Sequence, residues 1–246
     1  LLSDFARVSQ AAGARADYVQ GGGGNTSVKL PGGLMAIKAS GFCLSDIRPD
    51  KAYAVLDGAD LRNFYLTIEP SALADVEKEG SARAKADIRH IDGLADLRPS
   101  VEAGFHSILK TFVVHTHSVY ANLAACSTAC RPIAAQAFAG ANYTWGWVPY
   151  TDPGANLTFA IRDELRRVEK ETSKAPSVIL MQNHGIIVHD DDPDAALAIH
   201  TDANERLARM FGLSGTSFPK IAVREMAAGI HAADVPYLAE QFRTGG

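Results

Sequence analysis

Short apolar runs bounded by turn residues constrain the fold of this chain most. Residues 111–115 (Thr-Phe-Val-Val-His) and 177–181 (Ser-Val-Ile-Leu-Met) are rich in β-branched and bulky apolar side chains, which is typical of buried strands. An alanine-rich segment at 119–125 and an apolar-periodic segment at 193–211 predict helices after them. Strands that alternate with helices indicate an α/β fold.

Other segments predict further elements. A helix is expected at 3–18, strands at 26–30, 34–38, 53–56 and 186–189, and a surface helix with connecting segments within 69–98. Pro31-Gly32-Gly33 indicates a hairpin between two of the strands, and Asp57-Gly58 indicates a turn. No repeat, low-complexity stretch or long linker divides the 246 residues, so we expect one domain over residues 1–246.

Composition excludes several classes of partner. With 24 basic and 28 acidic residues the net charge is -4, which leaves no electrostatic footprint for nucleic acid. No run of about 18 apolar residues and no signal-peptide pattern occurs, so we expect neither membrane insertion nor export. Three cysteines, an odd number in a chain of this length, favour reduced thiols and a cytoplasmic location.

Three histidines form the sharpest candidate for a chemical site. His115 and His117 are two apart at the end of a predicted strand, so both imidazoles point to one side. His184 ends the other apolar strand within Asn183-His184-Gly185, where the glycine allows a tight turn. Three nitrogen ligands suit a catalytic zinc site. Hydrogen bonding of these rings to backbone or water is the alternative that the residues alone leave open.

A glycine run suggests an anion site. Gly21-Gly22-Gly23-Gly24 precedes Asn25-Thr26-Ser27, so backbone N–H groups and polar side chains could face an anion. The run lacks the Gly-Lys-Ser/Thr ending of a phosphate loop, and Thr26 stands where a dinucleotide fingerprint needs glycine. A flexible loop explains the run equally well. Further donors and close-approach positions, each also explained as a turn or cap, are Ser40, Gly41 and Ser100.

Glu102 is the one carboxylate singled out as a candidate base. It lies just before the apolar helix and strand that lead to His115 and His117, with Ser100 as the expected helix cap. From spacing alone, the favoured interpretation is a first-turn carboxylate that interacts with the helix dipole for up to about 1 kcal/mol.

Five motifs, taken together and in their order along the chain, favour the functional interpretation of these residues over the structural one. The chain resembles the class II aldolase and adducin family over residues 3–211, through Gly24-Asn25-Thr26-Ser27, Ser40-Gly41, Pro99-Ser100-Val101-Glu102, His115-Thr116-His117 and Asn183-His184-Gly185. The residue sequence of these motifs looks closest to the aldolase half of proteins that fuse a rhamnulose-phosphate aldolase to a dehydrogenase. The resemblance implies a mixed central sheet flanked by helices and a homotetramer.

The resemblance also implies a ligand set. It assigns one zinc ion (Zn2+) per subunit to His115, His117 and His184, with Glu102 as the catalytic acid-base group that also ligates the metal before substrate binds. It assigns the substrate phosphate to Gly24, Asn25, Ser40, Gly41 and Ser100. Two departures stand out: Val101 replaces a second serine, and the position of the family's proton-donating tyrosine holds Gln136, which leaves Tyr143 and Tyr237 as candidates.

The implied activity is cleavage of a small ketose 1-phosphate to dihydroxyacetone phosphate and an aldehyde, through a metal-stabilised enediolate. Sugar-phosphate epimerases, dehydratases and decarboxylases of the same family are alternatives. A non-catalytic adducin-like interaction module is another, but the retained histidines and Glu102 argue against it.

Overall fold

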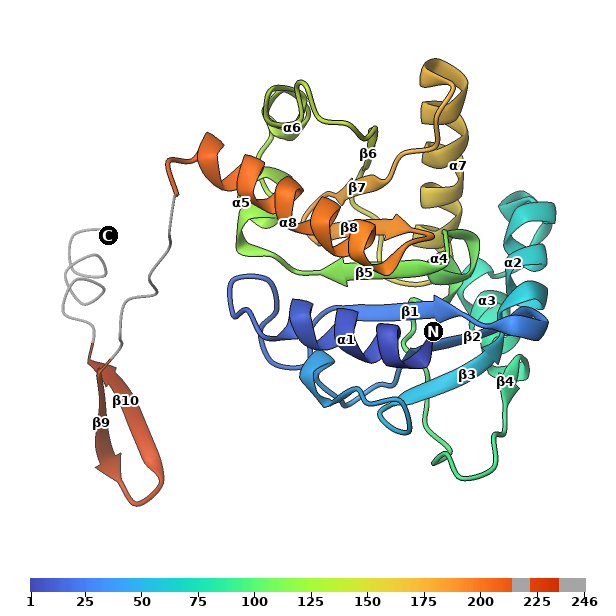
Figure 1. Ribbon diagram of the computed structural model, residues 1–246, viewed down its shortest axis with the longest axis horizontal. Helices are drawn as coiled ribbons and strands as arrows, with labels where there is room; N and C mark the ends of the chain where they lie inside the picture. The colour runs from blue at the N-terminus through green and yellow to red at the C-terminus, as the bar shows by residue number, and fades with distance from the viewer. Residues whose placement is uncertain (214–221, 235–246) are drawn as a thin grey trace. The chain divides into compact units, whose positions relative to one another are not determined.

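The computed structural model describes residues 1–213 and 222–234. The chain divides into two compact units, Leu1–Gly212 and Leu213–Gly246. The first contains a mixed eight-stranded sheet with helices on both faces, which confirms the predicted α/β class (Figure 1). In the second, β9 (Ala222–Ala227) and β10 (Ile230–Asp234) form an antiparallel hairpin. The expected single domain over 1–246 stays a prediction.

The large sheet has the strand order β4-β3-β2-β1-β5-β8-β7-β6. Adjacent strands in this sheet are antiparallel, except for β6 and β7, which are parallel. The strands are β1 (Asn25–Lys29), β2 (Leu34–Lys38), β3 (Tyr53–Asp57), β4 (Ile88–Arg89), β5 (Phe112–Thr116), β6 (Trp145–Val148), β7 (Val178–Met181) and β8 (Gly185–Asp190). Since β5 lies between β1 and β8, the start of β1 and the start of β8 both flank the end of β5.

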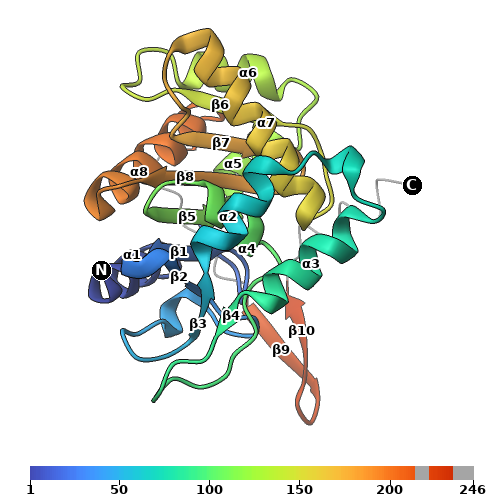
Figure 2. The same cartoon turned by 90° about the vertical axis from the view of Figure 1, so that its right-hand side faces the viewer.

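Two groups of helices cover the sheet (Figures 1 and 2). One face carries α1 (Leu2–Gly13), α5 (Val119–Ala125) and α8 (Pro193–Met210), and α6 (Cys130–Ala137) packs against α8. The other carries α2 (Gly58–Thr67), α3 (Val76–Ala86), α4 (Ala103–Ile108) and α7 (Ala155–Thr172). Phe105, Val113, Leu157 and Ile187 belong to the buried core on this second face. Among the described residues, no helix combines the length and apolar character that crossing a membrane requires.

Most predicted elements are confirmed to within a few residues, with three corrections. The first helix ends at Gly13 rather than at residue 18. Asp57-Gly58 is a helix start and not a turn, because Asp57 accepts a hydrogen bond from the backbone N–H of Asp60 at 2.9 Å. Ser100 does not cap α4, which begins at Ala103 with Glu102 in the N-cap position.

The sequence did not lead us to predict several elements. The most important of them is α7, which contributes buried residues to the core on the second face. Its apolar residues Leu157, Ile161, Leu165 and Val168 recur at helical spacing, a signal that identifies the helix. Within 69–98 the structure has α3 and the short strand β4.

Candidate active site

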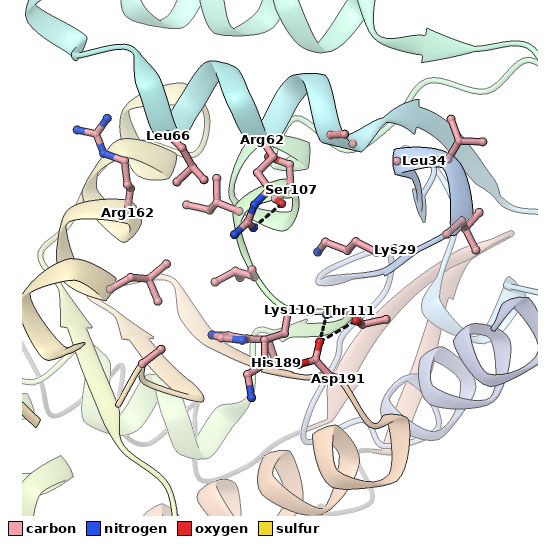
Figure 3. Close-up of a pocket in the computed structure, with 18 of the residues that line it drawn as sticks. Lys29, Leu34, Arg62, Leu66, Ser107, Lys110, Thr111, Arg162, His189 and Asp191 are labelled. Atoms are coloured by element: carbon pink, nitrogen blue, oxygen red, sulfur yellow. Dashed lines mark hydrogen bonds between the residues drawn. The ribbon is translucent and has the colours of Figure 1, made fainter. Parts of the chain in front are cut away.

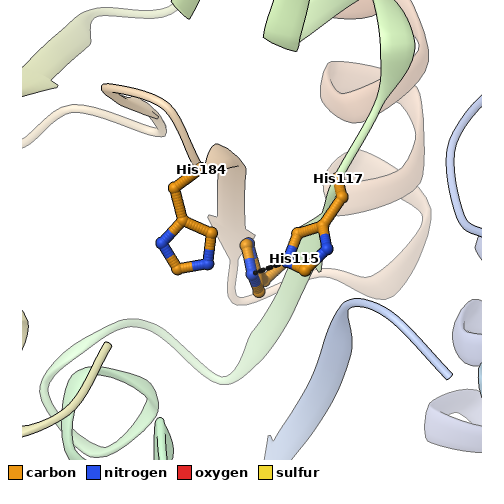
Figure 4. A group of neighbouring side chains, drawn as sticks. All are labelled: His115, His117 and His184. Carbon is orange, nitrogen blue, oxygen red and sulfur yellow. Dashed lines mark hydrogen bonds between the residues drawn. The ribbon is translucent and has the colours of Figure 1, made fainter. Parts of the chain in front are cut away.

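Three histidine rings meet where β5 ends and β8 begins (Figure 4). His115 is near the end of β5, His117 follows the strand, and His184 lies in the turn between β7 and β8. Nε2 of His115 is 3.1 Å from Nε2 of His117. One ligand atom from each ring lies within 4.8 Å of the other two. The structure therefore brings together the three residues singled out in the sequence.

Local geometry explains the convergence. Thr116 points to the opposite face of the sheet, where its Oγ1 and Nε2 of His200 are 2.7 Å apart, so His115 and His117 share the other side. In the turn that carries His184, the positive φ of 53° falls on Asn183. Gly185 is needed for a different reason than expected: a Cβ there would collide with the carbonyl of Thr116.

The charge states of His115 and His117 suit metal binding. Nδ1 of His115 donates to the carbonyl of Ile186 at 3.0 Å, which leaves Nε2 unprotonated and turned toward the cluster. Burial lowers the pKa of His115 to about 3 and also lowers the pKa of His117. At neutral pH both rings are therefore uncharged, as metal ligation requires.

The carboxylate of Glu102 lies against this cluster. Oε2 is 3.6 Å from Nε2 of His115, and Oε1 is 3.2 Å from Nε2 of His184. Burial by itself raises the pKa of Glu102, but the rings of His115 and His184 and the amide of Asn25 outweigh burial and hold this pKa below its ordinary value. Glu102 is therefore ionised at neutral pH.

These four residues fit a divalent metal ion. Oε1 of Glu102 is buried and accepts no hydrogen bond within the described part of the chain, which costs free energy that a cation would offset. The 3.1 Å between Nε2 of His115 and Nε2 of His117 is close to the separation of about 3.3 Å expected for two nitrogens bound to tetrahedral zinc at about 2.0–2.1 Å. Three imidazoles with a carboxylate suit zinc and similar transition ions.

A buried chain of hydrogen bonds orients Glu102. The sequence did not predict that the residues of this chain contact one another. Nδ2 of Asn25 donates to Oε2 of Glu102 at 2.6 Å. Since a carboxylate only accepts, Oδ1 of Asn25 faces His106, whose Nε2 donates to it. Nδ1 of His106 is 2.7 Å from Oγ of Ser27. His106, one helical turn after the N-cap residue Glu102, thus fixes the Asn25 amide.

Two of the candidate phosphate-binding residues, Asn25 and Ser100, contact Glu102, and the others are in the neighbouring loops. Nδ2 of Asn25 also donates to Oγ of Ser100 at 3.0 Å. Gly24 has a φ of 66°, and a Cβ there would lie 2.6 Å from the carbonyl oxygen of His115. Ser40 donates from Oγ to the carbonyl of Pro99 at 3.1 Å, so its loop lies against the one that carries Ser100. Gly41 has a φ of 89°, and a Cβ there would meet no atom within 4 Å.

A buried lysine among these loops was missed by the sequence reasoning. Lys38 is 4 % exposed, and its Nζ donates to the carbonyls of Gly22 at 3.2 Å and Phe42 at 2.7 Å. It is close enough to His117 to help lower the pKa of that ring. The sequence signal that could have identified Lys38 is its position as a charged residue at the end of the otherwise apolar strand β2.

The structure leaves the proton-donating tyrosine unassigned. The hydroxyl of Tyr143 donates to Asp202 on α8 at 2.8 Å, and burial together with this carboxylate raises the pKa of Tyr143. Gln136 is exposed on α6. Tyr237 lies outside the described residues.

The fold and the cluster together define an α/β protein with a candidate transition-metal site. The model of the Class II Aldolase and Adducin N-terminal domain matches residues 3–211. The chain belongs to this family. No sequence among the curated proteins matches it significantly.

Solved structures share the fold. An N-terminal class II aldolase domain from Thermoplasma acidophilum has a TM-score of 0.69 and 20% identity, over 85% of this chain and 93% of that chain. YgbL from Klebsiella pneumoniae, described as an aldolase, epimerase or decarboxylase, has a TM-score of 0.58 and 18% identity, over 88% and 91%. L-fuculose 1-phosphate aldolase from Glaciozyma antarctica PI12 has a TM-score of 0.52 and 14% identity, over 98% and 80%.

Proposed function

We propose that this protein is a zinc-dependent aldolase that cleaves a small ketose 1-phosphate to dihydroxyacetone phosphate and an aldehyde. The observation that carries the proposal is the position of Glu102, whose buried carboxylate reaches within 3.6 Å of His115 and 3.2 Å of His184. Membership of the class II aldolase and adducin family and the structural likeness to an L-fuculose 1-phosphate aldolase support a sugar-phosphate substrate.

In this proposal His115, His117 and His184 hold the metal, with Glu102 against it before substrate binds. When bound, the metal supplies a Lewis acid for the carbonyl and adjacent hydroxyl oxygens of the ketose. Its expected content is one ion per subunit, in a homotetramer.

Glu102 moves the protons. It is ionised at neutral pH because of its neighbours, so it can accept a proton from the substrate and return it to the carbon left after the carbon–carbon bond breaks. Asn25 holds Oε2 through a hydrogen bond, which leaves Oε1 as the oxygen that exchanges the proton. Burial of the carboxylate keeps bulk water from competing for it.

The phosphate is held by Gly24, Asn25, Ser40, Gly41 and Ser100. The backbone N–H groups of the glycine loops and the hydroxyl of Ser100 provide donors suited to an anion. The amide of Asn25, which donates to Glu102 and to Ser100, positions that hydroxyl. Lys38 adds a positive charge beside these loops, which offsets the hydroxyl lost at Val101.

Metal content and products test the proposal. We expect about one zinc per chain by elemental analysis of tag-free protein, lost in His115→Ala/His117→Ala and retained in the control His90→Ala/His231→Ala, which removes two exposed histidines. Ketose 1-phosphates should then yield dihydroxyacetone phosphate. Isomerised pentulose 5-phosphate without a triose product indicates an epimerase instead. Failure to hold metal after zinc is resupplied contradicts the proposal and favours an adducin-like module.

A further inference from the structure

A second pocket lies at the opposite end of β1 from the histidine cluster (Figure 3). Asn25, at the start of β1, contacts Glu102, whereas Lys29, at its end, lines a cavity of about 610 Å³. The turn after β1, helices α2 and α7, and the segment between α4 and β5 form its walls. The four residue steps of extended strand from Asn25 to Lys29 separate these two residues by about 13 Å.

Two cations enter this pocket without a carboxylate partner. Nζ of Lys29 donates to the carbonyl of His106, and Nη1 of Arg62 donates to the carbonyl of Ser107 at 3.2 Å. Neither forms an ion pair within the described part of the chain. Figure 3 shows both side chains extending into the same space. Burial, followed by the charge of Arg62, lowers the pKa of Lys29, and the more weakly acting carboxylate of Asp191 does not offset them. The position of Lys29 therefore favours a further anion beside it.

A buried histidine faces the same cavity with both nitrogens unpaired. His189, on β8, is 3 % exposed and lines the pocket. Neither Nδ1 nor Nε2 has a hydrogen-bond partner among the described residues, and the nearby carbonyl of Pro176 only helps to raise the pKa. Burial dominates and lowers the pKa of His189 to about 3. At neutral pH the ring therefore holds one unused N–H donor, a costly arrangement unless a ligand completes it.

The other charges of the pocket are largely engaged elsewhere. Lys110 pairs with Asp190 at 3.0 Å. Asp191 accepts hydrogen bonds from the backbone N–H of Thr111 at 3.1 Å and from its Oγ1 at 2.7 Å. Arg162 is bound by Glu69 at 3.2 Å. The charged lining residues are five basic ones against two acidic ones, Asp191 and Glu169, so positive charge is in excess; the basic ones are Lys29, Arg62, Lys110, Arg162 and Arg166. Of these, Lys29 and Arg62 form no ion pair among the described residues, and with the histidine donor they are the groups left for an anion.

We propose that this pocket binds a small organic phosphate monoester, with the phosphate between Lys29, Arg62 and His189. A phosphate monoester carries nearly two negative charges at neutral pH, which balances the two unpaired cations, and its oxygens accept from all three side chains. The organic part would lie against Leu34, Leu66 and Leu165, which also line the cavity. The site does not depend on the proposed aldolase reaction.

Equilibrium dialysis with inorganic phosphate and with n-butyl phosphate tests the site. All proteins carry Asn25→Ala/Ser100→Ala, which weakens the candidate phosphate site near Glu102. Any binding that remains at that site is common to all the variants. In this background we expect one phosphate per chain, tighter binding of n-butyl phosphate, and at least tenfold weaker binding after Lys29→Met, Arg62→Gln or His189→Gln. Arg166→Gln is the matched control, because Arg166 lines the pocket but lies near Glu69 and Asp163, and it should stay within twofold.

Arg62→Gln decides the test where a buried variant fails to fold, because Arg62 is exposed. Circular dichroism and the midpoint of thermal unfolding verify the fold of each variant. Phosphate binding that is unchanged by Arg62→Gln, or weakened equally by Arg166→Gln, overturns the proposal. An aldolase test that fails while this binding persists leaves the pocket assignment intact.

Discussion

Nδ2 of Asn25 donates to Oε2 of Glu102 at 2.6 Å, although 77 positions separate the two residues. The carboxylate can only accept, so this contact sets the orientation of the amide and engages one oxygen. The other oxygen, Oε1, lies 3.2 Å from Nε2 of His184. Glu102 therefore presents one anchored oxygen and one that is available for chemistry.

Replacing Glu102 by glutamine should remove the base but not the metal. We expect Glu102→Gln to lower kcat by about 10²–10⁴-fold, the range usual for a general base, with zinc content near that of the wild type because three histidines remain. Steady-state kinetics on a cleaved ketose 1-phosphate and elemental analysis check this. Glu205→Gln, at an exposed position of α8, is the control, and unchanged turnover of Glu102→Gln would refute the assigned role.

His106 should act through Asn25. His106→Leu leaves Oδ1 of Asn25 without its donor, so we expect kcat to fall by about tenfold while KM and zinc content change little. The free energy of unfolding should fall by about 1–3 kcal/mol for the unsatisfied buried acceptor. His106→Gln retains an N–H donor and should recover part of kcat, measured beside urea unfolding. Equal kcat in His106→Leu and wild type rules out this positioning role.

Gly24 should be irreplaceable for two separable reasons. Gly24→Ala places a methyl group at a φ of 66° and 2.6 Å from the carbonyl oxygen of His115. Gly21→Ala, at a φ of 56° with open space, has only the backbone strain, about 1–3 kcal/mol. We expect Gly24→Ala to lose more stability than Gly21→Ala in urea unfolding and to lose zinc, which Gly21→Ala retains. Equal losses would show that the contact with His115 is unimportant.

Acid should destabilise the fold through His200. Burial lowers the pKa of His200 to about 3, so between the unfolded value of about 6.5 and the folded value only the unfolded chain binds the proton. Its stabilising contribution is complete above pH 6.5 and is lost as pH falls toward 3, by about 1.4 kcal/mol per pH unit. Urea unfolding at pH 7, 6 and 5 should show a shallower pH dependence for His200→Gln than for wild type; parallel curves would exclude this linkage.

Local patterns in the sequence identified much of the sheet. The apolar runs that became β5 and β7, and the hairpin signal at Pro31-Gly32-Gly33, depend on neighbouring residues alone. Helix α7 has the same kind of local signal, since its apolar residues recur at helical spacing. The prediction of a turn at Asp57-Gly58 was wrong because this pair suits both a turn and the start of a helix. The residues that follow decide between the two.

For the candidate site, the sequence alone determined the residue types and their order: two histidines spaced to share a strand face, a third after another strand, and a glutamate between glycine and histidine motifs. Only the tertiary structure decided that these groups meet, because the order β1-β5-β8 places distant segments side by side. It also decided where His106 and Lys38 lie, and that Lys29 and Arg62 form no ion pair within the described part of the chain. Pairing, burial and the absence of a counter-charge depend on residues far apart in the chain, which no local spacing encodes.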